Sequence, residues 1–374
     1  MVAVGDVCLG MGVLDSIRHF GPDFPFAPCS PILRQGDLVF GNLEMVLYDR
    51  GTQLRESRID FKVPLPYGAG LGRAGFQVLS VANNHILDFG TPACQDTLKF
   101  LQKQGIQTVG CGRDLKEARK PAICMVRGQR VGFLAYSDDV GQSKGPHGPC
   151  VAPIKKKNLL EDIRALRQQV DLIIISLHAD LEFVAYPAPW RVRLCRQLIE
   201  AGADLILQHH PHVPQGVERY RHGMIIYSLG SFVFPVAGND YADHPWTDQS
   251  FILRVWMDRR GIASAEFLPV RINRFNQPVP LSDEDQRREF LRYLRQISLP
   301  LHRPDLLDRF WLQSCIAAFG THWSWIKEVY WEKGWAGVVQ CLEFLARTSE
   351  NRRWLLGLLS GMARFGLRDG FRHK

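Results

Sequence analysis

The 374-residue chain lacks the features that identify several large classes of protein. Its nine cysteines are an odd number, scattered without a C-x-x-C pair, which argues against a disulfide scaffold or a zinc ribbon and indicates a reducing compartment. It has no charged-then-apolar signal segment and no run approaching the roughly 20 apolar residues of a membrane span. We therefore expect a cytoplasmic protein from the sequence as given; a missing N-terminal anchor would make it membrane-associated or extracellular.

The sequence also has no internal repeat, no low-complexity stretch and no RNA- or DNA-binding motif, so no nucleic-acid partner is expected. Its hydrophobic content of 46% and charged content of 22% are those of an ordinary globular protein. The net charge of +8 favours anionic partners, such as phosphates, anionic polymers or a membrane surface, without identifying one.

The most informative feature present is a group of three histidines in four residues, His209-His210-Pro211-His212, directly after the apolar run 203–207. Ligands of α/β sheets collect beyond the carboxyl ends of the strands, and neutral imidazole is the commonest transition-metal ligand among side chains. The alternative is a turn that happens to hold histidines. Three imidazoles packed so closely favour a metal site.

Other short apolar runs also end in residues that can bind a cation. Such nearly continuous runs are typical of strands covered on both faces. The residues that end or follow them are Asp6, Asn42, Glu44, Asn84, His85, Asp88 and His178. Any one of these could cap a helix, but five runs that end in this way, the histidine group included, indicate a shared site.

Strand and helix patterns alternate along the first three quarters of the chain, which predicts an α/β layered fold with helices covering sheets. Helices are expected at 91–104, 155–169 and 189–201, and later strands at 224–234, 251–257 and 262–270.

From Asp283 onward helix patterns replace strand patterns, and 278–280 reads as a linker. We therefore predict a domain at 1–280 and a helical extension at 281–374. The last candidate helix, 351–367, has an apolar stripe opposite arginines, a pattern typical of a helix packed on its own domain and also of a membrane-surface helix.

Seven motifs follow one another in a characteristic order and spacing. They are 5–10 (GDVCLG), 42–44 (NLE), 82–90 (ANNHILDFG), 176–182 (SLHADLE), 202–204 (GAD), 209–215 (HHPHVPQ) and 227–232 (YSLGSF). Together they resemble the CapA family, the poly-γ-glutamate capsule synthesis proteins, over roughly residues 1 to 275. The resemblance implies a layered α/β/β/α sandwich of calcineurin-like metallophosphatase type, followed here by a C-terminal helical extension.

The resemblance also implies a dinuclear metal centre that activates water, with two divalent ions such as Mn, Fe or Zn. Asp6 and His212 would bind the first ion. Asn84, His178 and His210 would bind the second, and the Glu44 carboxylate would bridge the two.

Further side chains are expected behind the ligands or facing the substrate. They are Asn42, Asp88, His209 and Ser231. His85 would donate a proton to the leaving group or only hydrogen-bond to Asp88. Glu182 would orient the substrate or a water, or be a solvated loop carboxylate.

The sequence departs from the pattern of the family at several positions, none of them a proposed ligand. Cys8 stands where hydrolytic metallophosphatases usually have His, and Ser231 where the family has Asn. Ala179-Asp180 replaces Trp-Gly, and Gln208 replaces Gly.

Two functions of different class follow. The first is a metal-dependent hydrolase or transferase acting on a phosphoester or an amide-linked anionic polymer. The second is a non-catalytic accessory protein that binds poly-γ-glutamate or another anionic polymer, or supports a membrane synthase, in a capsule or exopolymer assembly system. The retained ligand set favours the first.

Overall fold

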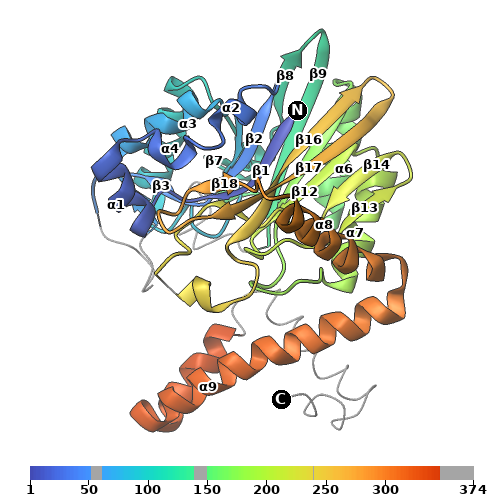
Figure 1. The fold of residues 1–374 in the computed structure, drawn as a ribbon. Coiled ribbons are helices and arrows are strands. Elements are labelled where there is room, and N and C mark those ends of the chain that lie inside the picture. Colours follow the sequence, from blue (N-terminus) through green and yellow to red (C-terminus); the bar gives the residue numbers. More distant parts are fainter. Residues whose placement is uncertain (52–60, 139–149, 239, 346–374) are drawn as a thin grey trace.

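The computed structural model describes residues 1–51, 61–138, 150–238 and 240–345 of the chain. Two large β-sheets lie face to face at its centre, and helices cover the outer face of each sheet (Figure 1). The predicted α/β/β/α sandwich of metallophosphatase type is therefore confirmed, and helices follow it along the chain as expected. The predicted helix at 351–367 lies outside the described residues.

The first sheet has eight strands, with β1 near its centre. Strands β15, β1, β2, β5 and β6 are parallel, so their carboxyl ends share one edge of the sheet. In order across the sheet the strands are β18 (Pro278–Pro280), β17 (Gly261–Ile272), β16 (Gln249–Asp258), β1 (Val2–Val7), β2 (Val39–Leu43), β5 (Val78–Ser80) and β6 (Gln107–Val109), with β15 (Ser231–Val233) beside the end of β1.

The second sheet has six strands, of which the four central ones are parallel. In order they are β13 (Val217–Tyr220), β14 (Gly223–Ile226), β12 (Leu205–His209), β11 (Leu172–His178), β9 (Gln129–Ser137) and β8 (Ala122–Val126).

Strand β11 shows why its apolar run is continuous. Leu172 and Ile174 belong to the core between the sheets, whereas Ile173 and Ile175 belong to the core beneath the covering helices. Successive side chains of a strand point to opposite faces, and here both faces are buried.

Three predicted helices are present and cover the sheets. On the first sheet lies α4 (Gly90–Lys103), beside α1 (Met11–Phe20) and α3 (Ala69–Ala74). On the second lie α6 (Lys156–Arg167) and α7 (Pro189–Glu200) (Figure 1).

Smaller elements complete the body of the protein. They are η1 (Phe24–Phe26), α2 (Ser30–Leu33), β3 (Val46–Leu47), β4 (Lys62–Val63), η2 (Leu65–Gly68), β7 (Cys111–Gly112), α5 (Leu115–Ala118), β10 (Cys150–Val151), η3 (Asp240–Asp243) and η4 (Leu299–His302).

The structure corrects two readings of the sequence. The run 224–234 is two strands, β14 in the second sheet and β15 in the first, and the chain crosses between the sheets at 227–230. A continuous apolar run does not reveal this change of sheet. Residues 278–280, read as a linker, form the edge strand β18 paired with β17, a position where the missing N–H of proline is tolerated.

In the described part of the chain, the α-helices α8 (Glu284–Ser298) and α9 (Pro304–Leu345) follow β18. Helix α8 buries Phe290, Leu294 and Ile297 in the core of the first sheet. Helix α9 runs below the body and bends at Gly334, whose φ is 62° (Figure 1). Among the described residues, no helix combines the length and the apolar character needed to cross a membrane.

Candidate metal centre

The carboxyl ends of strands from both sheets meet at one edge of the sandwich. Asp6 lies at the end of β1 and Glu44 directly follows β2, both in the first sheet. His178 and His209 end the neighbouring parallel strands β11 and β12 of the second sheet. The packing of the two sheets therefore brings together candidate ligands that are far apart in the sequence.

Asn42 connects the two sheets at this edge. Its Nδ2 donates a hydrogen bond of 2.8 Å to Asp6 Oδ1 and lies 3.3 Å from Nδ1 of His178. All three side chains are buried. The amide thus holds a carboxylate of one sheet and an imidazole of the other at fixed positions.

The hydrogen bonds continue into the loop after β5. His178 Nε2 lies 2.9 Å from Asn84 Oδ1, and Asn84 Nδ2 lies 2.9 Å from His85 Nε2. Because the amide oxygen accepts and the amide nitrogen donates, His178 carries its proton on Nε2 and His85 accepts at Nε2. His85 Nδ1 then donates to Asp88 Oδ2 at 2.7 Å, so Asp88 orients the His85 ring.

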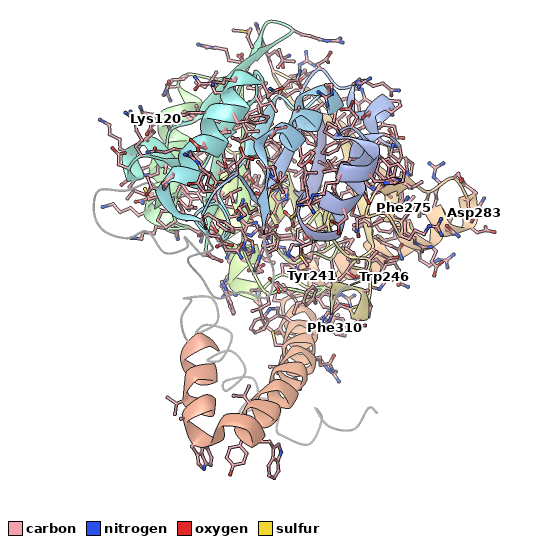
Figure 2. The ribbon with its side chains drawn as sticks, turned by 90° about the vertical axis from the view of Figure 1, so that its left-hand side faces the viewer. Lys120, Tyr241, Trp246, Phe275, Asp283 and Phe310 are labelled. Atoms are coloured by element: carbon pink, nitrogen blue, oxygen red, sulfur yellow. The ribbon has the colours of Figure 1, made fainter. Side chains whose placement is uncertain are left out.

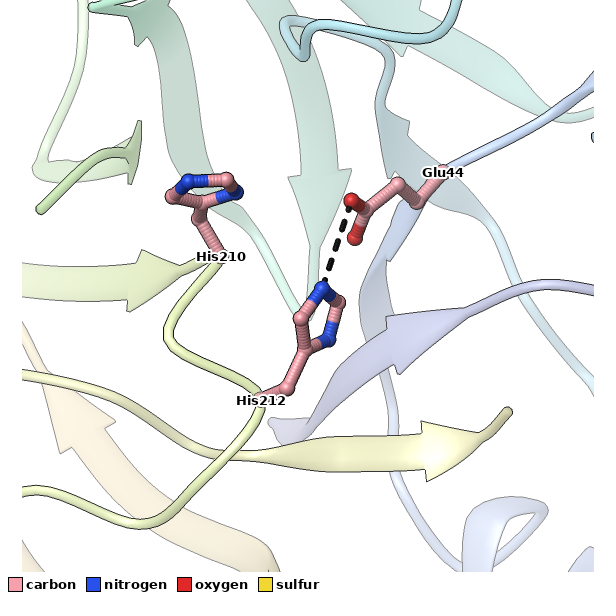
Figure 3. Close-up of side chains that lie close together, drawn as sticks. All are labelled: Glu44, His210 and His212. Carbon is pink, nitrogen blue, oxygen red and sulfur yellow. Dashed lines mark ion pairs between the residues drawn. The ribbon is translucent and has the colours of Figure 1, made fainter. Parts of the chain in front are cut away.

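Glu44 lies at the centre of the histidines. Its Oε1 is 3.6 Å from His178 Nε2, 3.7 Å from His212 Nε2 and 3.8 Å from His85 Nε2. Figure 3 shows its carboxylate directed toward the loop of His210 and His212. The residue is fully buried, and within the described chain neither carboxylate oxygen has a hydrogen-bond partner.

Two groups of three side chains offer ligand atoms within 4.8 Å of one another. They are Glu44, His210 and His212, and Asp6, Glu44 and His178. Glu44 belongs to both, as a bridging carboxylate would. These groups place His210 with His212, whereas the sequence predicts His210 with His178 at one ion. The rings of His178 and His210 lie 4.7 Å apart, centroid to centroid.

The histidine loop has an unusual backbone. His210 has a φ of 95° and His212 a φ of 57°, in the left-handed region that non-glycine residues rarely adopt. Strain of this kind persists only where the surroundings impose it, and it concentrates at functional sites. One of these constraints is a backbone hydrogen bond of 3.1 Å from His210 N–H to Asp6 Oδ2.

His209 and Ser231 contact the candidate ligands Asp6 and His212. His209 is fully buried, with Nδ1 3.2 Å from Asp6 Oδ1. Ser231 Oγ lies 3.3 Å from His212 Nδ1, and it stands beside Asp6 in the pairing of β15 with β1. Both side chains can fix the orientation of a ligand.

The two carboxylates have opposite pKa shifts. Burial, together with the charges of Asp6, Glu182 and Asp88, raises the pKa of Glu44 well above its usual value. Burial also acts to raise the pKa of Asp6, but the hydrogen bond and charge of His209, helped by His212 and Asn42, hold it below its usual value.

Two of the histidines, His178 and His212, are held neutral. Burial, reinforced by the neighbouring imidazoles, lowers the pKa of His178 well below its usual value. Burial likewise lowers the pKa of His212 to about 4, despite the opposing effect of Asp6 and Glu182. Neutral imidazole is the form that binds a metal ion.

Glu182 lies in the loop 179–188 after β11, close enough for its charge to act on Glu44 and His212. Beside it is an aromatic wall that the sequence did not predict. Phe183 stacks on His244 at 3.9 Å and contacts Tyr241 at 5.3 Å, and the Tyr241 ring lies 5.2 Å from that of His212. No motif marks these aromatic residues.

Two departures from the family pattern contact each other. Gln208 Nε2 donates to Asp180 Oδ2 at 2.9 Å, and Asp180 Oδ1 accepts from Arg191 Nε at 3.1 Å. Arg191 also pairs with Asp138. Cys8 is buried, its Sγ accepts from Gly10 N–H at 3.4 Å, and it belongs to neither group of potential ligands found in the described chain.

These residues fit a divalent cation. Both Glu44 oxygens and His210 Nδ1 lack a hydrogen-bond partner in the part of the chain that the structure describes, although all three atoms are buried. An unpaired buried polar atom is costly unless a ligand satisfies it. The mixture of carboxylate, amide and imidazole donors is suited to Mn, Fe or Zn.

The sandwich and the ligand groups at its strand ends define a protein of metallophosphatase-like fold. The chain belongs to the family described as "Bacterial capsule synthesis protein PGA_cap", which matches residues 1–236. The expected CapA relationship is confirmed.

Two relatives cover most of the chain. The capsule biosynthesis protein CapA of Bacillus anthracis is 30% identical over 305 residues, which are 79% of this chain and 72% of that protein. The PGA biosynthesis protein CapA of Bacillus subtilis is 29% identical over 301 residues, 79% of this chain and 77% of that protein. A putative 5'-nucleotidase from Staphylococcus aureus aligns with 70% of this chain and 50% of its own, at 14% identity and a TM-score of 0.42.

Proposed function

We propose that the protein is a metal-dependent hydrolase that acts on an anionic polymer of the poly-γ-glutamate type or on a phosphoester. The central observation is Glu44, a buried carboxylate surrounded by neutral imidazoles and without a hydrogen-bond partner among the described residues. Burying a charged carboxylate without a partner is costly, and bound cations would compensate its charge.

In this proposal two divalent cations would be held by Glu44 together with five further side chains, which are Asp6, Asn84, His178, His210 and His212. Bound cations would supply a Lewis acid and lower the pKa of a water molecule. Asn42, His209 and Ser231 keep the ligands in place through their contacts with Asp6, His178 and His212.

His85 is the proposed proton donor to the leaving group. Asp88 accepts from its Nδ1 at 2.7 Å and so directs Nε2 toward Asn84 and Glu44. Nε2 therefore faces the same space as the proposed ligands. To act as an acid the ring would take up a second proton at Nε2, in place of the hydrogen bond that Nε2 accepts from Asn84 Nδ2. Glu182 would orient the substrate or a water from the opposite loop.

The alternative is an accessory protein that binds an anionic polymer or supports a membrane synthase without catalysis. The net charge of +8 favours this reading, and the two CapA relatives are named for biosynthesis. The buried ligand set favours hydrolysis, because polymer binding alone does not require it.

Metal analysis of the purified protein tests the proposal. We expect wild type to retain close to two divalent ions per chain and His210→Ala to lose most of its metal, because His210 is a proposed ligand. His222→Ala, on the exposed turn between β13 and β14, is the matched control and should keep wild-type metal. Equal, negligible metal in all three proteins would refute the metal-dependent reading.

A chelator-sensitive screen of phosphodiesters and γ-glutamyl peptides then separates hydrolase from accessory protein. Hydrolysis that stops with chelator and falls by about 10²–10⁴-fold in His85→Ala, the usual range for a general acid, supports the hydrolase. Bound metal with no turnover in the screen, and an anionic polymer that binds equally to wild type and His85→Ala, supports the accessory protein.

A further inference from the structure

The two loops that border the metal centre rest on helices that lie beyond the family match. The loop 179–188 presents Glu182 and Phe183, and the segment 240–248, called the second loop, presents Tyr241 and His244. The family match ends at residue 236, so α8, α9 and the second loop have no role assigned by it.

The back of the first loop packs against α9. Val184 and Ala188 form a buried cluster with Trp311, Leu312 and Cys315 of that helix. Tyr186 stacks on Phe310 at 5.3 Å, and Trp190, at the start of α7, meets Trp311 edge to face at 4.9 Å. Figure 2 shows Phe310 where α9 meets the body.

The second loop is held by α8. Trp246 stacks on Tyr293 with ring centroids 3.7 Å apart and planes 5° from parallel. Within the loop, the Thr247 hydroxyl lies 2.6 Å from the Tyr241 carbonyl and 2.9 Å from the His244 carbonyl. Trp246 is thus the chain neighbour of Thr247, which is hydrogen-bonded to Tyr241, and the Tyr241 ring packs on that of His212.

The two loops also meet each other over the centre. Phe183 lies between His244 and Tyr241, and the Tyr241 ring packs on that of the proposed ligand His212. Phe183 itself has a φ of 62°, so its backbone is held in a conformation that packing must maintain.

We infer that α8 and α9 are positioning elements of the site: Tyr293 and Trp311 hold the loops that place Glu182, Phe183, Tyr241 and His244 around the metal centre. The positioning of the loops does not depend on the proposed function, and only its effect on substrate binding rests on that proposal. The loops contain none of the proposed metal ligands, so the helices set how a substrate is received and leave metal binding unchanged.

Hydrogen–deuterium exchange of the full chain, read by mass spectrometry, tests the inference without requiring activity. In Trp311→Ala we expect amide exchange in 180–188 to rise about tenfold, because the loop loses its aromatic support. In Tyr293→Ala the rise should occur in 240–248. Trp311→Phe and Tyr293→Phe, which keep a ring, should restore most of the protection.

Matched controls lie on the same helices. Trp331 of α9 is 83% exposed and Leu291 of α8 is 39% exposed, so Trp331→Ala and Leu291→Ala should leave both loops at wild-type exchange. Unchanged exchange in both loops of Trp311→Ala and Tyr293→Ala would overturn the inference. A rise spread equally over both sheets, and still present in the Phe variants, would also overturn it.

A second readout separates this inference from the proposed function. Titration with Mn²⁺ should give wild-type affinity in Trp311→Ala, while inorganic phosphate should bind the Mn²⁺-loaded variant about tenfold more weakly than wild type. Protein that binds none of Mn²⁺, Fe²⁺ and Zn²⁺ refutes the proposed function, and the exchange data still decide whether the helices position the loops. Weakened Mn²⁺ binding in Trp311→Ala would count against the positioning role.

Discussion

At the scale of single residues, Glu44 combines full burial with two carboxylate oxygens that no described protein group satisfies. Its raised pKa means that the folded, metal-free protein holds a proton there that the unfolded chain releases. Stability therefore falls as pH rises from about 4.5 toward the folded-state pKa, by up to about 1.4 kcal/mol per pH unit for the one proton.

Glu44→Gln should remove the loss of stability that deprotonation of Glu44 causes as pH rises. We expect the metal-free variant to gain stability over metal-free wild type as pH is raised from 5 to 8, and to lose the metal that wild type binds. Urea unfolding at both pH values, with chelator present, measures the first effect. A stability difference that stays constant across this range would contradict the raised pKa.

His212 predicts the opposite slope. Its folded-state pKa of about 4 lies below the unfolded value of 6.5, so the unfolded chain takes up a proton first as pH falls. The stability that it contributes is present above pH 6.5 and is lost between 6.5 and about 4, up to roughly 3 kcal/mol. In chelator, His212→Asn should flatten the profile in this window relative to wild type; an unchanged slope would argue against a neutral His212.

Some residues of the site could be predicted from the sequence and others could not. Asp6, Glu44, His178 and the histidine group end apolar runs, so their meeting at strand ends could be predicted. Phe183, Tyr241 and His244 could not, because an aromatic side chain in a loop carries no sign of which distant residue it will contact.

At the scale of elements, the pairing of β1 depends on a missing side chain. A Cβ on Gly5 would lie 1.8 Å from the carbonyl oxygen of Gly230, which also accepts a hydrogen bond from Asp6 N–H at 3.1 Å. Only glycine lets the crossing segment 227–230 approach β1 so closely.

Gly5→Ala should destabilise the protein by about 3 kcal/mol, as a severe overpacking change does, and weaken metal binding because Asp6 moves with the strand. Gly72→Ala is a suitable control, since its new Cβ in α3 would meet no atom closer than 3.5 Å. That variant should be neutral or stabilised by about 0.5–1 kcal/mol. Thermal unfolding of both measures the difference, and equal behaviour would show that β1 can adjust.

The elements that the sequence predicted are those with a strong pattern, such as the continuous apolar run of β11 and the helical period of α6. Strands β14 and β15 merged into one prediction because both are apolar and only four residues separate them. The prolines of 278–280 favour a linker because proline is rare inside sheets, and the structure tolerates them because β18 is an edge strand.

At the scale of the whole molecule, the division at residue 280 predicts that residues 1–280 fold alone. The packing of α8 bears on this boundary, because Phe290, Leu294 and Ile297 are buried against the first sheet. Leu301, farther along, accepts a hydrogen bond of 2.7 Å from Arg196 through its carbonyl.

A domain that folds alone at 1–280 and a domain whose core includes α8 are distinguished by chains that end at residue 280 and at residue 303. We expect the longer chain to be more stable by roughly 5 kcal/mol, since each buried apolar side chain contributes about 1.5–3 kcal/mol. Urea unfolding of the two chains measures the difference. Equal stability would support a domain boundary at 280 and make α8 an appendage.

The crossing at 227–230 has a consequence for how the layers can move. This segment is bonded to both sheets at the metal end, through Gly230 to Asp6 and through Leu229 to Gln208. The opposite ends of the strands have no such crossing at the described turns of β8–β9 and β13–β14. On heating, the two β-sheets should therefore begin to separate at those turns, while the segment 227–230 still holds them together at the other end. The distance between Asp6 and His178 should be among the last to change.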